Sequence, residues 1–158
     1  MANTQAMCTS FKKEILNGSH AFGTQATNSV RTVTTKDTFN MALYLATATL
    51  GAATTEYSAT GELAATGNYT AKGALVTNAT APATSGTTAY WTPSAKVTWT
   101  NLTSSGSFDA ALLINNKSTG ANELAVAVFT FTAQSIVAAD FSLNMPVNDS
   151  TTGLIRLA

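Results

Sequence analysis

The chain has 158 residues, an ordinary length for one domain, and eight Lys and Arg balance eight Asp and Glu, giving a formal net charge of zero. Only 10% of the residues are charged, whereas 45% are hydrophobic. A nucleic-acid-binding protein needs an excess of clustered basic residues, and a disordered chain has few hydrophobic ones, so the composition argues against both classes. Neither a nucleic-acid partner nor a polybasic membrane-surface role is expected.

Hydrophobic runs and cysteine usage predict where the protein is made. No apolar run approaches the roughly 18 residues of a membrane span, so no membrane partner is expected. Residues 1–11 lack the basic and apolar regions of a secretory signal. The single cysteine, Cys8, has no partner for an internal disulfide. We therefore expect synthesis in the cytoplasm without a signal peptide. The zero net charge favours association with other chains.

Residues 1–29 are predicted to form an N-terminal arm that contains a short helix. Thr9 or Ser10 can cap this helix, and Gly18 can end it because glycine tolerates the left-handed conformation. At two turns or fewer the helix is not stable alone, so it must dock on a partner or plug one end of its own fold. Phe11, Ile15 and Leu16 are expected on one apolar side of this helix, with Lys12 and Lys13 facing out. All five side chains are candidate contacts: Phe11, Lys12, Lys13, Ile15 and Leu16.

Residues 30–158 are predicted to form one β-domain. Runs of alternating or continuous apolar residues, separated by turn residues, predict strands at 30–35, 39–46, 56–58, 68–77, 90–91, 96–102, 107–115, 123–132, 137–145 and 154–157. Residues 39–46 alternate, which predicts a half-buried strand, and residues 79–88 are expected to be a surface loop. The nearly continuous runs at 107–115 and 123–132 predict central strands covered on both faces. The expected fold is an all-β antiparallel β-sandwich, jelly-roll or Ig-like, with a short N-terminal helix.

Catalytic and metal-binding patterns are missing from the sequence. A Ser-His-Asp triad would have to use His20, the only histidine, which we expect at the surface or in an interface. Cys8 is expected to be a buried small apolar residue. Zinc needs closely spaced Cys and His, and no phosphate-binding or dinucleotide-binding glycine motif occurs. We therefore expect no enzyme activity, no cofactor and no metal.

Six carboxylates are the candidates for acid–base chemistry: Glu56, Glu62, Asp109, Glu123, Asp140 and Asp149. Asp109 lies inside an apolar run, and it is expected on the outward face of its strand or paired with Lys117 or Lys96. Glu56 and Glu62 lie near turns and are expected in solvent. None of these positions forms a recognisable carboxylate pair.

The aromatic residues Tyr90, Trp91 and Trp99 support an alternative function. Aromatic rings can stack on sugars, so these three residues could form the platform of a tail-fibre or host-adhesion module that binds glycans. Aromatic residues at strand spacing are also typical of a protein core. The sequence leaves both interpretations open.

Several segments resemble a family of small structural proteins from tailed-bacteriophage virions. Cys8-Thr-Ser-Phe-Lys12 followed by Glu14 is similar to the family's N-terminal segment, and Asp37 to Tyr44 is similar to a strand with the pattern DTF-x-x-ALY. The glycine-containing stretches 60–63 and 67–73 and the ending Ile155-Arg156-Leu157 continue the resemblance along nearly the whole chain. These motifs are structural, and none is catalytic.

The resemblance implies a head-decoration, or cement, protein that binds the outside of an HK97-type capsid lattice. Its partners would be the major capsid protein and further copies of itself, as a dimer or a trimer. The capsid-contact candidates are then the five residues of the short helix, with Lys12 and Lys13 facing acidic groups of the partner. The expected location is the capsid exterior of a virion, after synthesis in the host cytoplasm.

Overall fold

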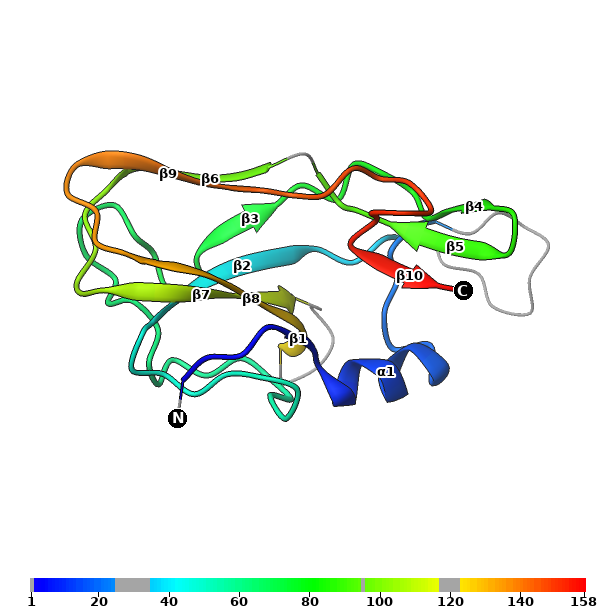
Figure 1. Cartoon of the computed structure of the whole chain (residues 1–158), viewed down its shortest axis with the longest axis horizontal. Helices are drawn as coiled ribbons and strands as arrows, with labels where there is room; N and C mark the ends of the chain where they lie inside the picture. The colour runs from blue at the N-terminus through cyan, green and yellow to red at the C-terminus, as the bar shows by residue number, and fades with distance from the viewer. Residues whose placement is uncertain (1, 25–34, 95, 117–122) are drawn as a thin grey trace.

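The computed structural model describes residues 2–24, 35–94, 96–116 and 123–158, and within them the chain is mostly β-structure with one short helix (Figure 1). The elements in chain order are β1 (Ala6–Met7), α1 (Thr9–Leu16), β2 (Phe39–Leu45), β3 (Ala74–Val76), β4 (Ala83–Ser85), β5 (Thr88–Trp91), β6 (Lys96–Leu102), β7 (Phe108–Asn115), β8 (Leu124–Gln134), β9 (Ala139–Asn144) and β10 (Ile155–Leu157). Every strand pairing is antiparallel. The predicted antiparallel β-structure with a short N-terminal helix is confirmed.

The strands form three sheets. A five-stranded sheet has the order β1-β8-β7-β2-β3, a three-stranded sheet the order β10-β5-β4, and β6 and β9 form a two-stranded ribbon. In the five-stranded sheet Met41 of β2 lies opposite Leu113 of β7, which lies opposite Ala127 of β8. Figure 1 shows the β6–β9 ribbon as a layer above β2, β7 and β8, with α1 below them.

Aromatic side chains fill the space between the ribbon and the five-stranded sheet. The ring of Phe141 in β9 lies 5.0 Å from that of Phe108 in β7 and 5.5 Å from that of Phe131 in β8. Trp99 of β6 lies 5.7 Å from Phe141. Such ring pairs bury large apolar areas and prefer the tilted and edge-to-face geometries seen here. The two layers are therefore joined by one continuous apolar contact.

Burial along the central strands follows the sequence prediction in part. In β7 all residues from Ala110 to Asn115 are buried, as the continuous apolar run predicts. In β8 the prediction holds for Ala125, Val126 and Val128 but is wrong near the end, where Thr132 and Ala133 are exposed. β2 was predicted to be half-buried, yet Ala42 and Tyr44 on its second face are also fully buried.

The second face of β2 is buried because an irregular segment covers it. Leu63 N–H donates to the Leu43 carbonyl, and Leu45 N–H donates to the Gly61 carbonyl, so residues 61–63 extend along β2 beyond β3. Gly61 has a φ of +82°, and a Cβ built on it would lie 2.8 Å from the Ala48 Cβ. Glycine is required there by both the conformation and the close approach.

Some elements differ from those predicted. Residues 79–88 were expected to be a loop, but they contain β4 and the first residue of β5, and the two strands form a hairpin in which Thr84 pairs with Ala89. Of the predicted strand 68–77 only β3 forms, and Glu56 makes only an isolated bridge to Leu124. Residues 30–34 of the predicted strand 30–35 lie outside the described residues, as do residues 25–29 of the predicted arm. Short hairpins in Thr- and Ser-rich segments lack the apolar alternation on which the prediction depends.

The N-terminal segment is hydrogen-bonded into the five-stranded sheet. Ala6 and Met7 of β1 pair with Val128 and Ala127 of β8, although no strand was predicted there. Cys8, rather than Thr9 or Ser10, occupies the N-cap of α1 and makes no side-chain capping bond. The helix ends at Asn17 followed by Gly18 with a φ of +65°, as predicted.

Candidate functional site

The five candidate contact residues on α1 divide between its inner and outer sides. Phe11 is fully buried, and its ring lies 4.8 Å from that of His20 and 6.0 Å from that of Phe22. Ile15 is half-buried against the same core, because residues four apart share a helix face. Lys12 and Lys13 are exposed, and Leu16 is 88% exposed.

This division corrects the candidate list. Phe11 belongs to the protein's own core, where its burial stabilises the docked helix by about 1.5–3 kcal/mol, so it is not free to contact a partner. Lys12, Lys13 and Leu16 form the outward stripe of α1, and they remain candidate contacts. The sequence pattern placed Phe11 and Leu16 on one apolar side, whereas the structure places them on opposite sides of the helix.

The three aromatic residues of the glycan alternative do not form one platform. Trp91 is 2% exposed and packs on Phe22 and Phe39, with its Nε1–H donating to the Thr80 carbonyl at 3.0 Å. Trp99 is 5% exposed and belongs to the separate cluster under the β6–β9 ribbon. Both indole rings are core residues, so this expectation is corrected, and only Tyr90 is half-buried.

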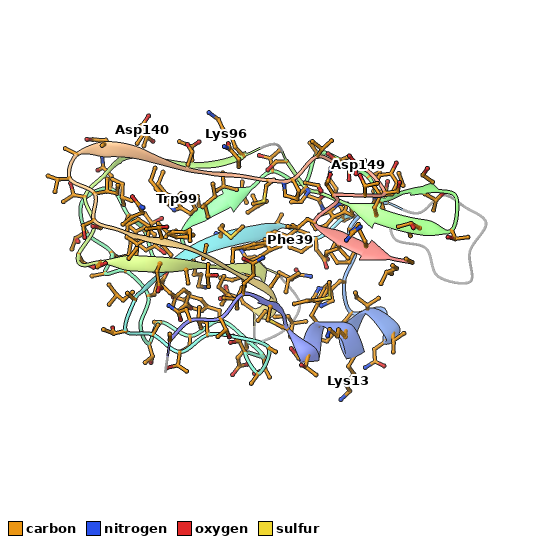
Figure 2. All side chains as sticks on the ribbon, in the orientation of Figure 1. Lys13, Phe39, Lys96, Trp99, Asp140 and Asp149 are labelled. Carbon is orange, nitrogen blue, oxygen red and sulfur yellow. The ribbon has the colours of Figure 1, made fainter. Side chains whose placement is uncertain are left out.

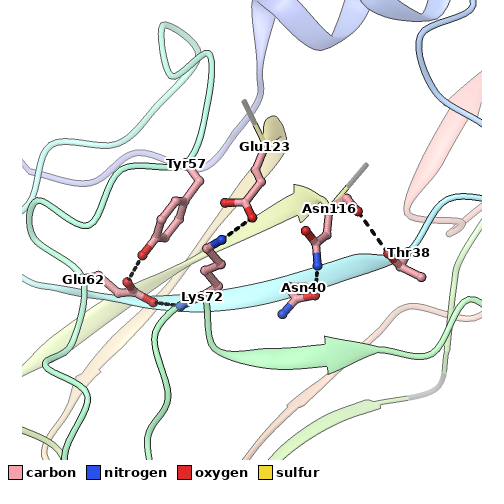
Figure 3. A network of polar contacts seen from close by, with 7 residues as sticks. All are labelled: Thr38, Asn40, Tyr57, Glu62, Lys72, Asn116 and Glu123. Carbon is pink, nitrogen blue, oxygen red and sulfur yellow. Dashed lines mark hydrogen bonds and ion pairs between the residues drawn. The ribbon is translucent and has the colours of Figure 1, made fainter. Parts of the chain in front are cut away.

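Glu62 lies at the centre of a polar cluster that covers one end of β2 (Figure 3). It is 8% exposed, which corrects the expectation that it lies in solvent. Its Oε2 accepts a hydrogen bond from the Tyr57 hydroxyl at 2.5 Å, and its Oε1 accepts from the Tyr69 hydroxyl at 2.7 Å and from the Lys72 N–H at 2.6 Å. The Tyr69 hydroxyl also accepts from the Leu43 N–H at 2.9 Å. The Glu62 cluster therefore joins three irregular segments to the sheet.

Burial and the Glu62 carboxylate keep these phenols protonated. Burial is the larger cause that raises the pKa of Tyr69, followed by the negative charge of Glu62. For Tyr57, burial and the hydrogen bond to Glu62 raise the pKa in the same way. Lys72 completes the cluster, because its Nζ pairs with Glu123 Oε1 at 2.5 Å and lies 5.7 Å from the centre of the Tyr57 ring. The cluster is a structural joint in which every named carboxylate has a donor.

A second contact network in Figure 3 joins the ends of β2 and β7. The Thr38 hydroxyl donates to the Asn116 carbonyl at 3.1 Å, and Asn116 Nδ2 donates to Asn40 Oδ1 at 3.5 Å. These bonds align the start of β2 with the end of β7.

His20 lies at the centre of a second polar cluster, between α1 and the five-stranded sheet. Its side chain is fully buried, which corrects the expectation of a surface or interface histidine. His20 Nε2 lies 2.8 Å from Glu14 Oε2, and His20 Nδ1 lies 2.8 Å from Asn115 Nδ2. Asn115 Nδ2 also donates to Asp37 Oδ2 at 2.6 Å, and that oxygen accepts from the Ala21 N–H at 2.8 Å. The His20 cluster therefore fastens the helix to β7 and to the segment before β2.

Cys8 and Asp109 are the remaining candidates from the sequence. Cys8 is fully buried, and burial followed by the Glu14 charge raises the pKa of its thiol to about 11, which confirms the expected buried residue. A thiol with so high a pKa is a poor nucleophile at neutral pH. Asp109 Oδ1 accepts a hydrogen bond from Asn3 Nδ2 at 2.6 Å, so its partner is an amide of the N-terminal segment rather than the expected Lys96. Lys117 lies outside the described residues.

Two hollows on the surface differ in size and lining. One is an open groove of about 1090 Å³ along the Thr- and Ala-rich residues 47–61 and the N-terminal residues Ala2 and Thr4. A smaller apolar cavity of about 240 Å³ lies among β1, β8, α1 and β10. Among the described residues, no three His, Cys, Asp or Glu side chains gather as a metal site would require.

The sequence could not have predicted either polar cluster. Tyr57, Glu62 and Tyr69 are irregularly spaced, and the predicted strands 56–58 and 68–77 carried no register that would bring the two tyrosines to Glu62. His20 and Asn115 are 95 positions apart. Neither set forms a motif with local spacing, and only the chain's path brings the members together.

Comparison with known proteins found no match. No protein-family model, curated protein or solved structure matches the chain. In the part of the chain that the structure describes, no helix has the length and apolar character needed to cross a membrane. The function of the chain is therefore inferred from the residues described above.

Proposed function

We propose that this chain is a structural protein of a bacteriophage virion, of the head-decoration type, which binds the outside of the capsid lattice and stabilises it. The observation that carries the proposal is the outward stripe of α1. The helix is docked through Phe11 and Ile15, yet it exposes 88% of Leu16 beside Lys12 and Lys13. These three side chains are therefore accessible to a partner chain.

The fold and the sequence resemblance support this proposal. Two layers of antiparallel strands suit a small sandwich, of jelly-roll or Ig-like type, like those that the resemblance implies. The polar clusters at Glu62 and His20 are buried joints, and the proposal assigns no catalytic step, cofactor or metal to the chain. Virion assembly in the host cytoplasm requires no membrane passage. The glycan-binding alternative is not carried forward, because Trp91 and Trp99 are core residues.

The proposal includes contacts between copies of the chain, as a dimer or a trimer on the capsid. β9 and β4 lie at the edges of their sheets, and an edge strand offers unpaired backbone groups to a neighbour. Symmetric pairing of such edges is a common route to small oligomers. Chemical cross-linking of intact particles should yield dimers or trimers, and cross-links to the major capsid protein alone would contradict this part.

The number of copies per particle tests the proposed function. A calibrated gel of purified particles should show hundreds of copies of the chain, matching the many equivalent sites of a capsid lattice. A tail component would be present in tens. Absence from purified particles would overturn the proposal.

A further inference from the structure

The β6–β9 ribbon leaves one strand edge uncovered. Residues 141–144 of β9 pair in regular register with residues 96–99 of β6, and no other described strand pairs with β9. The edge strands of the other two sheets have two or three residues, whereas β9 has six. Lysine and proline commonly protect a strand edge, and β9 contains neither. The free side of β9 can therefore accept a further strand.

An apolar cavity of about 200 Å³ lies between β9 and β8, beside this edge. Its apolar lining residues are Met41, Phe129, Phe131, Leu143, Met145 and Pro146. β6 contacts β3, which lies at the opposite edge of the five-stranded sheet from β8, so the free side of β9 lies on the β8 side. On that side β1 covers β8 only at Ala127 and Val128. The space between the two layers is therefore open along β8 and β9, and its half-buried apolar side chains gain burial when a strand covers them.

The outer face of the ribbon carries a cation at one end and a carboxylate at the other. Figure 2 shows Lys96 and Asp140 on the outer side of the ribbon, away from Trp99. Lys96 lies opposite Asn144, at the far end of β9 from Asp140. Both charged side chains are exposed, and neither forms an ion pair with a described residue. One oxygen of Asp140 accepts a hydrogen bond from the Asn101 N–H at 2.8 Å, which fixes the carboxylate in place.

We infer that β9 pairs antiparallel with β9 of a second copy of the chain, about a two-fold axis at Ser142. The inference rests on the contacts between copies in the proposed function and names the strand and the register that form them. In this register the partner's Asp140 lies opposite Asn144, which lies opposite Lys96. Neighbouring strands are about 4.8 Å apart, so Lys96 and the partner's Asp140 are about 10 Å apart at the backbone, a span that the two side chains can bridge. The two-fold axis creates this charge pair twice.

Charge and side-chain direction distinguish this register from its neighbours. A slip of one residue would place inward side chains opposite outward ones, because alternate side chains point to opposite faces. An axis at Asp140 would place two carboxylates opposite each other, which is unfavourable. An axis at Phe141 would align Lys96 with a residue beyond the partner's β9, and an axis at Leu143 would align it with the partner's Ser142. With the axis at Ser142, the inner face also gains a contact between Leu143 and the partner's Phe141, beside the cavity.

Cysteine variants of the full chain test the register directly. Ser142→Cys, in a Cys8→Ala background, places two cysteines opposite each other at the axis and should give a disulfide-linked dimer on mild oxidation. Asn144→Cys in the same background is the matched control. Its two copies would lie about 14 Å apart, too far for a disulfide. Asp140→Cys/Asn144→Cys should restore the cross-link, because these two positions face each other between copies.

Charge exchange tests the pairing without a covalent bond. Sedimentation equilibrium of the purified chain measures the dissociation constant of the dimer. Lys96→Glu should weaken the dimer at least tenfold, because each dimer contains two such pairs. Lys96→Glu/Asp140→Lys should restore the constant to within threefold, and Lys13→Glu, at an exposed cation on α1, should change it less than twofold. The wild-type dimer should weaken as salt rises.

The outcomes separate this inference from the proposed function. The cross-linking is carried out both in concentrated solution and on purified particles. If the particles carry hundreds of copies but Ser142→Cys forms no dimer in either setting, the β9 pairing is wrong while the proposed function stands. If Ser142→Cys dimers form in solution but the chain is absent from particles, the pairing stands and the proposed function falls. Equal cross-linking of Ser142→Cys and Asn144→Cys, or a cross-link from Ser142→Cys to the major capsid protein alone, overturns the inference.

Discussion

The Glu62 cluster and the His20 cluster have the same structural role but use different chemical groups. Each one fastens segments without regular strand structure onto the five-stranded sheet. At Glu62, a buried carboxylate receives two phenol hydroxyls and one backbone N–H. At His20, an imidazole lies between the carboxylate of Glu14 and the amide of Asn115.

The difference lies in how completely the donors and acceptors match. Both oxygens of Glu62 accept hydrogen bonds, and the phenols that donate to them stay protonated up to strongly alkaline pH. In the His20 cluster, Asn115 Oδ1 is buried without a partner among the described residues, while Asn115 Nδ2 serves both His20 and Asp37. With the amide in this orientation, His20 Nδ1 accepts the hydrogen bond from Asn115. The Glu62 carboxylate thus has a donor for each oxygen, whereas the His20 cluster leaves one buried amide oxygen unmatched.

The largest expected effect is that of removing Glu62. Glu62→Ala leaves the Tyr57 and Tyr69 hydroxyls and the Lys72 N–H without an acceptor, and should lower the free energy of unfolding by about 3–5 kcal/mol. Urea denaturation monitored by tryptophan fluorescence measures the change. The control is Glu56→Ala, an exposed glutamate nearby, which should change stability by less than about 0.5 kcal/mol. Equal effects of the two variants would contradict the structural role of Glu62.

Two substitutions at His20 come next. His20→Ala removes both hydrogen bonds and the ring contacts to Phe11 and Phe22, and should cost about 2–3 kcal/mol. His20→Gln should cost less than about 1 kcal/mol, because its amide N–H can donate to Glu14 while its oxygen accepts from Asn115.

Hydrogen exchange of the α1 amides measures how firmly the helix is held. Protection should be lost in His20→Ala and retained in His20→Gln. Equal loss of α1 protection in His20→Ala and His20→Gln would contradict the role of these two hydrogen bonds in holding the helix.

Tyrosine-to-phenylalanine variants measure how much each phenol hydroxyl of the Glu62 cluster contributes to stability. Tyr69→Phe removes the donor to Glu62 and the acceptor of the buried Leu43 N–H, and should cost about 1–3 kcal/mol. Tyr57→Phe removes a single hydrogen bond at a half-buried site and should cost about 1 kcal/mol or less. Urea denaturation at pH 7 ranks the two. The reverse ranking would show that Leu43 gains little from the Tyr69 hydroxyl.

At neutral pH Cys8, beside the His20 cluster, should show no effect, but its stability contribution should change at alkaline pH. Its pKa is raised from 9.0 to about 11, so the folded state holds a proton that the unfolded state releases. This contribution to stability is complete below pH 9 and is lost as pH rises from 9 to 11, with a slope of at most about 1.4 kcal/mol per pH unit. Cys8→Ala should have a flatter stability profile between pH 9 and 10, below the ordinary pKa of tyrosine. Parallel profiles for the two proteins would contradict the raised pKa.

Local apolar patterns predicted most of the strands. The run around Val97 and Trp99 predicted β6 with its exact bounds, and the runs at 107–115 and 154–157 predicted β7 and β10 to within one residue. Side-chain alternation and turn residues act over a few neighbours, so they can be read without the fold. The same patterns could not predict β1 or β4, which are too short to show alternation.

Antiparallel strands and a short helix ending before Gly18 can be predicted from the sequence, because those features depend on neighbouring residues. The inward position of Phe11, the exposure of Leu16 and the burial of Glu62 and His20 depend instead on how distant segments pack. Burial of a polar side chain is favourable only where distant segments supply its hydrogen bonds, as Tyr69 does for Glu62 and Asn115 does for His20. Those partners are set by the path of the whole chain, which no local pattern records.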